Sequence, residues 1–230
     1  MLTAIGLTSA ATAQTTISTG HVDIFGVGYV GGALDLLIHE EDTMLELEPA
    51  DTVLQINPGG LVLRPAGAAF DFLGASGTSL WVLPQSEIES AARGVIFAGV
   101  GTEEINPFDW GAGTPITITL LGMVSAPAGG NFFLWSEDEF GVPTQVMNST
   151  NLTTYNSLTQ GIGLHEHHNW GFTAEGIYEI EFEAAGTPEG TAALSSGVQT
   201  YSFDIIPEPS TYALLGAGAL ALLATRWRRP

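Results

Sequence analysis

The sequence predicts an all-β protein whose central domain is an antiparallel β-sandwich, immunoglobulin-like or jelly-roll-like, with a barrel as the second choice. Short runs of β-branched and aromatic residues recur at roughly ten-residue spacing, separated by Gly, Pro, Asn and Asp. Helical periodicity is weak and is confined to 86–93 and the two ends of the chain. The expected architecture is therefore a succession of short strands joined by turns.

Ten strands are expected between the two ends of the chain. Alternation is clearest at 177–183, where apolar side chains from Tyr178 to Phe182 alternate with glutamates, as in a strand with one buried face. The stretch 184–197, rich in Ala, Gly, Ser and Thr, is expected to be a hairpin loop. In chain order, the strands are placed at 19–27, 33–39, 53–57, 80–83, 95–99, 116–124, 131–135, 163–172, 176–187 and 197–205.

The charge balance excludes a nucleic-acid-binding role. The 230-residue chain has 25 acidic side chains and 5 basic ones, all arginine, which gives a formal net charge of −20. Binding to phosphate backbones depends on Lys and Arg. Hydrophobic residues form 45% of the chain, a share that can build a core and argues against disorder. Because the chain has no Cys, any metal must be held by nitrogen and oxygen.

The first 13 residues have features of a signal peptide. They are small and apolar and end in Ala11-Thr12-Ala13, the A-x-A pattern of a cleavage site, which makes Gln14 the first mature residue. A positively charged leading region is missing, which is consistent with a truncated start. We therefore expect an exported protein whose central domain comprises residues 14–206.

The C-terminal segment, 207–230, resembles the PEP-CTERM sorting signal. Its three parts are Pro207-Glu208-Pro209, an apolar run at 212–224, and the arginines Arg226, Arg228 and Arg229. The resemblance implies a Gram-negative protein that an exosortase processes, with these proline, glutamate and arginine residues as the processing signal. The apolar run is expected to form a helix outside the core that anchors the protein transiently in the membrane.

The histidines are the strongest candidates for a binding site. His165 and His167 stand two residues apart on an expected strand, so both rings project from one face, and His168 faces the other way. His21 shares a face with Asp23 by the same rule, and His39 ends the second expected strand. A lone histidine is more often a surface or core residue than a ligand, and for the His-x-His pair both interpretations remain open on spacing alone.

A second resemblance, to the choice-of-anchor M domain of PEP-CTERM proteins repressed by the zinc-uptake regulator, covers about residues 19–205. It rests on GHVDI at 20–24, LDLLIHEED at 34–42, WVLPQ at 81–85, GTEEI at 101–105, HEHHNWGF at 165–172 and GIY at 176–178. The resemblance implies zinc binding outside the inner membrane, with His21, His39, His165 and His167 as metal ligands. Asp23, His168 and Asn169 are further candidates for the metal site or its surroundings. Leu37 replaces a histidine common in the family, so the resemblance does not extend to a fuller or second site.

Three functions follow from these observations. The first is a non-enzymatic protein that captures or buffers Zn²⁺, with a zinc transporter as a partner. The second is a structural protein of the cell surface whose acidic sandwich contacts exopolysaccharide, with tryptophans such as Trp110 as candidates for stacking sugars. Glu103 and Glu104 could bind calcium, but without a spaced calcium-binding loop they are expected to form a solvated acidic surface. The third, a zinc-dependent hydrolase with Glu166 as base, is disfavoured because strand alternation points Glu166 away from its two histidine neighbours.

Overall fold

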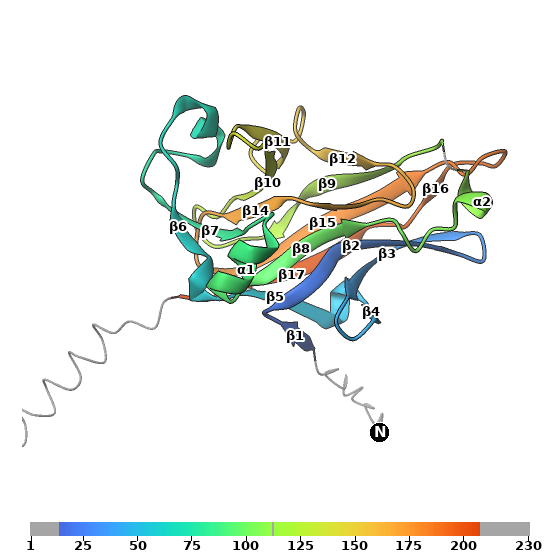
Figure 1. Cartoon of the computed structure of the whole chain (residues 1–230), viewed down its shortest axis with the longest axis horizontal. Coiled ribbons are helices and arrows are strands. Elements are labelled where there is room, and N and C mark those ends of the chain that lie inside the picture. The colour runs from blue at the N-terminus through green and yellow to red at the C-terminus, as the bar shows by residue number, and fades with distance from the viewer. Residues whose placement is uncertain (1–13, 112, 208–230) are drawn as a thin grey trace, which may run out of the picture.

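The computed structural model describes residues 14–111 and 113–207, and it is an all-β sandwich, as the sequence predicts (Figure 1). The expected signal peptide and the apolar C-terminal helix lie outside the described residues. Within the described residues, no helix is long and apolar enough to cross a membrane.

Three sheets make up the fold. The first has the strand order β1 (Thr15–Ile17), β5 (Thr52–Ile56), β17 (Gln199–Ile205), β15 (Gly176–Gly186), β9 (Ile116–Ser125) and β12 (Ser157–Gln160), and β16 (Leu194–Ser195) also pairs with β15. The second has the order β11 (Pro143–Asn148), β10 (Phe132–Glu137), β14 (Asn169–Phe172), β7 (Ser79–Leu83) and β6 (Leu61–Leu63). The third has the order β13 (His165–His167), β8 (Ile96–Gly101), β2 (Gly20–Val30), β3 (Ala33–Glu40) and β4 (Leu45–Leu47).

Five short helical segments connect these strands. They are η1 (Pro49–Asp51), η2 (Pro58–Gly60), η3 (Ala68–Leu73), α1 (Glu87–Arg93) and α2 (Pro107–Trp110). Helix α1 occupies the weakly periodic stretch predicted at 86–93. Its first turn is capped by the Ser86 hydroxyl, which accepts a hydrogen bond from the Glu89 amide, and it ends at Gly94 in the left-handed region.

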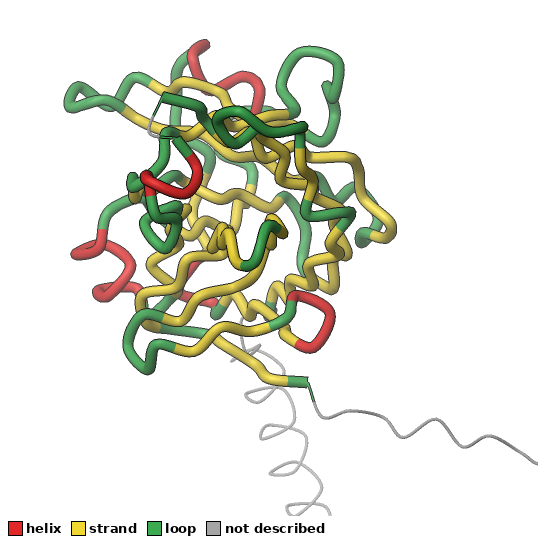
Figure 2. Tube along the Cα trace, turned by 90° about the vertical axis from the view of Figure 1, so that its right-hand side faces the viewer, coloured by secondary structure: helices red, strands yellow, loops and turns green. Residues whose placement is uncertain are grey.

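The first sheet packs against the other two around a large core rich in aromatic residues, and a smaller second cluster contains Phe133 and Trp135. Figure 2 shows the strands arranged around the centre of the molecule. Phe25 of β2 contacts Phe182 of β15 at 4.7 Å between ring centroids, and Phe132 of β10 contacts the same ring at 5.8 Å. The alternation predicted for β15 is confirmed, since Tyr178, Ile180 and Phe182 are buried. Trp81, Trp110, Trp135 and Trp170 are also buried, so none of these four offers a free face for stacking a sugar.

One expected strand is corrected by the structure. The stretch 163–172 contains two strands in different sheets: β13 pairs with β8, whereas β14 pairs with β7 and β10. His168 is the residue at which the chain passes from one sheet to the next. The other nine expected strands are present, and the sequence missed the short or peripheral strands β1, β4, β6, β11, β12 and β16.

Candidate metal site

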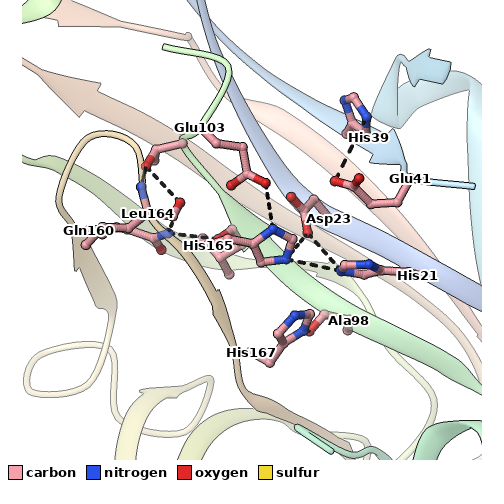
Figure 3. A network of polar contacts seen from close by, with 12 residues as sticks. His21, Asp23, His39, Glu41, Ala98, Glu103, Gln160, Leu164, His165 and His167 are labelled. Atoms are coloured by element: carbon pink, nitrogen blue, oxygen red, sulfur yellow. Dashed lines mark hydrogen bonds and ion pairs between the residues drawn. The ribbon is translucent and has the colours of Figure 1, made fainter. Parts of the chain in front are cut away.

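Three of the five histidines meet on the outer face of the third sheet (Figure 3). β8 separates β2 from β13; His21 lies opposite Phe97 of β8, and His165 and His167 lie opposite Gly101 and Gly99. The inward neighbours on these strands, such as Val22 and Val100, are fully buried, so alternation turns the histidines outward. The three imidazole rings have centroids 4.7 to 5.0 Å apart.

Asp23 extends its carboxylate over β8 toward this cluster. A Cβ atom at position 99 would lie only 1.9 Å from Asp23 Oδ1, and one at position 101 would lie 2.1 Å from Oδ2. Glycine at both positions is therefore required for the carboxylate to lie against the strand. Asp23 is only 2% exposed, and its Oδ1 forms no regular hydrogen bond although it lies 3.0 Å from His165 Nε2.

His165 is held between two carboxylates. Its Nε2 atom faces Asp23, and its Nδ1 atom lies 2.7 Å from Oε1 of Glu103. The interactions with Asp23 and, to a lesser degree, Glu103 raise the pKa of His165 to about 9, although burial opposes the shift. In the metal-free protein this ring is therefore an imidazolium at neutral pH.

His167 has the opposite electrostatics. Burial, together with the neighbouring His165 and His21, lowers the pKa of His167 to about 4 even though the Ala98 carbonyl favours the protonated form. Its Nδ1 atom lies 3.0 Å from that carbonyl oxygen and must donate, because a carbonyl can only accept. The ring also stacks on Phe97 with centroids 3.6 Å apart. The neutral ring therefore keeps the lone pair of Nε2 free for a ligand.

His39 lies outside the three-histidine cluster, which corrects the expectation that four histidines would surround one ion. Its strand, β3, is separated from β13 by both β2 and β8, and neighbouring strands are spaced about 4.8 Å apart. His39 pairs in register with Asp23, is 7% exposed, and has its Nε2 atom 4.0 Å from Oε1 of Glu41.

His168 and Asn169 also lie outside the three-histidine cluster. His168 faces the interior, as alternation predicts; neither ring nitrogen has a hydrogen-bond partner, and burial lowers its pKa to about 4. Asn169 belongs to β14, where its side chain accepts from the Gln85 amide and donates to the Gln85 side chain. Glu166 points away from the cluster, as expected, with Oε2 3.8 Å from His168 Nε2.

Comparison with known proteins adds one finding. Residues 206–229 match the PEP-CTERM protein-sorting motif. The motif supports an exported cell-surface protein of Gram-negative bacteria that is sorted by an exosortase, as the three parts of the C-terminal segment predict. No significant match to a curated protein or to a solved structure was found.

Two glutamates that the sequence did not assign to the zinc site lie beside it. Glu41 and Glu103 form, with Asp23 and His165, a group whose ligand atoms lie within 4.8 Å of one another. Glu103 stands in a pair of glutamates that the sequence assigned to a solvated surface, and Glu41 follows His39 in an acidic run. The two glycines of Gly99-Val100-Gly101, which end two residues before Glu103, are the sequence signal that could have located this end of β8.

The donor set fits Zn²⁺. Zinc is bound tetrahedrally by imidazole nitrogen and carboxylate oxygen, with metal–ligand bonds near 2.1 Å and hence ligand atoms about 3.4 Å apart. His165 Nε2 lies 3.1 Å from His21 Nε2 and 3.0 Å from Asp23 Oδ1, and His21 Nε2 lies 3.9 Å from that oxygen. His167 lies within the same 4.8 Å group as the other two histidines. These residues could hold one ion with three nitrogens and one oxygen.

Proposed function

We propose that this exported, exosortase-sorted protein binds Zn²⁺ through His21, His165 and His167, with Asp23 as the fourth ligand, and that it captures or buffers zinc outside the inner membrane. One observation carries the proposal. Three imidazoles from two strands offer nitrogens within 4.8 Å of one another, and the buried Asp23 carboxylate lies 3.0 Å from His165 Nε2 and 3.9 Å from His21 Nε2. In the metal-free protein the proton on His165 balances this carboxylate, and a bound cation would take the place of that proton.

The groups around the ligands support a zinc site. In many zinc sites the second nitrogen of a ligating imidazole donates to a carboxylate or a backbone carbonyl, which fixes the ring and its tautomer. His165 has Glu103 in this position and His167 has the carbonyl of Ala98. Both contacts use Nδ1, so each ring can offer Nε2 to an ion.

The proposed role is storage or capture rather than catalysis. Catalytic zinc keeps a position open for water or substrate, whereas four protein ligands close the tetrahedron. Glu166, the residue considered as a catalytic base, points away from the cluster. The resemblance to choice-of-anchor M proteins under zinc-uptake control favours the same role, because such proteins would be made when zinc is scarce. A zinc transporter is the corresponding proposed partner.

The test is a zinc titration of the protein purified without a histidine tag. We expect near-stoichiometric binding at pH 7.5, and calcium at millimolar excess should not compete, since Ca²⁺ prefers all-oxygen sites. His167→Ala should weaken binding by about tenfold or more. Glu166→Ala is the matched control, because it alters the same strand on the other face and should leave the affinity unchanged. Absence of zinc binding in calorimetry and in competition with a chelating dye would refute the proposal.

A further inference from the structure

A small acidic pocket lies beside the three-histidine cluster, on the side of β2 and β3. It is lined by Asp23, Gly26, His39, Glu41, Gly101, Glu103 and Glu104. Its volume is about 10 Å³, which corresponds to one water-sized occupant. The pocket therefore has room for a single ion and for nothing larger.

The pocket is lined by four carboxylates, and the His165 imidazolium, paired with Asp23 and Glu103, can balance only part of their negative charge. Asp23, Glu41 and Glu103 offer oxygens within 4.8 Å of one another, a spacing at which like charges repel strongly. The two arginines of the described residues are engaged elsewhere, Arg64 with Asp71 and Arg93 with Glu89, and the chain has no lysine. The arrangement thus favours a cation from outside the chain.

His39 provides an independent indication that the pocket has a ligand. Its side chain is only 9% exposed, and Nε2 has no hydrogen-bond partner although it lines the pocket with Glu41 Oε1 at 4.0 Å. A buried ring nitrogen without a partner is costly, and imidazole nitrogen is a common zinc ligand. In Figure 3 the His39 and Glu41 side chains lie next to each other beside Asp23.

The two oxygens of Asp23 have different surroundings. A Cβ atom placed on Gly99 would approach Oδ1 and, at 2.8 Å, His165 Nε2. A Cβ atom placed on Gly101 would instead approach Oδ2 and, at 3.3 Å, Oε2 of Glu103. One oxygen thus lies on the histidine side and the other on the glutamate side, which is the arrangement of a carboxylate that can bridge two ions.

We propose that this pocket is a second cation site that takes Zn²⁺, held by His39, Glu41 and Glu103 and by the second oxygen of Asp23. The second site rests on the proposed function only because Asp23 would be a ligand of both ions. One imidazole with three carboxylates is a harder donor set than three imidazoles, so this site binds zinc more weakly than the three-histidine site. The capacity of the protein is then two zinc ions per chain.

The test is equilibrium dialysis of the full-length protein against Zn²⁺ at pH 7.5, followed by elemental analysis. The unaltered protein should bind two equivalents, whereas Glu41→Gln and His39→Leu should each bind one. Glu181→Gln, which removes the same charge on β15 in the first sheet, is the control and should bind two. Thermal unfolding of each variant verifies that the fold is retained, and Glu41→Gln is the safer variant because Glu41 is more exposed than His39.

The two sites can be distinguished in the same experiment. His167→Ala should lose the tighter equivalent and keep the weaker one, and adding Glu41→Gln to it should remove the second. If the unaltered protein binds a single equivalent at saturation, or if Glu41→Gln and His39→Leu keep two, the second site is refuted. If His167→Ala keeps both equivalents while Glu41→Gln loses one, the second site stands and the three-histidine site is refuted.

Discussion

Asp23 Oδ1 lies 3.0 Å from Nε2 of His165, although the two residues belong to strands that do not pair with each other. β8 runs between β2 and β13, and the contact reaches across it only because positions 99 and 101 carry no side chain. The candidate metal site thus depends on the middle strand as much as on the strands that supply its ligands.

Zinc binding should release about one proton per ion at pH 7.5. The pKa of His165 is about 9 in the metal-free protein, so the ring carries a proton that the metal must displace. Isothermal titration in buffers of different ionisation enthalpy measures this release. Glu103→Gln removes one of the two carboxylates that hold the proton and should lower the release. Equal heats in all buffers would contradict the prediction.

The zinc affinity should fall with pH. Below pH 9, protons compete with Zn²⁺ for the ring nitrogen of His165. The apparent zinc affinity should therefore drop by up to about tenfold for each unit by which the pH is lowered. His167 adds no such dependence until the pH approaches its pKa of about 4. Chelator-competition titrations from pH 8 to about 5.5 would measure the slope, and an affinity that is constant over this range would show that His165 is not a ligand.

Buried His168 should make the metal-free protein less stable in acid. Its pKa is about 4 in the folded chain and near 6.5 when unfolded, so the unfolded state binds more protons between these values. The free energy of unfolding is unaffected above pH 6.5 and falls as the pH drops toward 4, by at most about 1.4 kcal/mol per pH unit from this residue. Urea unfolding with chelator present should show a shallower pH dependence in His168→Phe than in the unaltered protein.

Gly99→Ala should damage the candidate metal site through Asp23. The added methyl group would lie 1.9 Å from Oδ1, so the carboxylate must move, at a cost of about 1–3 kcal/mol for overpacking. Zinc affinity should fall together with the melting temperature. Gly28→Ala, on β2, is the matched control, because a Cβ atom there meets nothing within 4 Å. Similar losses in both variants would mean that Gly99 has no special role.

Removal of residues 207–230 should leave the sandwich and its zinc affinity intact. The last strand, β17, ends at Ile205, and the final backbone contact of the sheet is the hydrogen bond from the Ile206 amide to the Ile56 carbonyl. The sorting motif lies almost entirely beyond that point. Thermal unfolding and zinc titration of the truncated protein test this expectation, and surface labelling of cells should show that the truncated form is no longer sorted.

Much of the sandwich could be predicted because its long strands have one dry and one wet face. β15 is the clearest case, with Tyr178 and Phe182 inside and glutamates outside. The change of sheet at His168 could not be predicted, because residues on both sides of it keep the extended, partly apolar pattern of one strand. Strands of two or three residues, such as β6 and β16, are too short to show any periodicity.

The site was predictable only where its residues lie on one strand. Alternation correctly placed His165 and His167 on one face and His168 on the other. The position of His39 depends on the order of strands in the sheet, which the sequence does not reveal. Glu41 and Glu103 were missed for the same reason, since each approaches Asp23 from a different strand end.

β13 has a further consequence as the edge of its sheet. It is three residues long, and among the described strands only β8 pairs with it. If β13 detached, the N–H and C=O groups along one side of β8 would be open to pairing with another chain, a common route to aggregation. An ion shared by His21 and His165 would fasten the edge strand to β2, two strands away. The same histidines would then protect the protein against self-association through this edge.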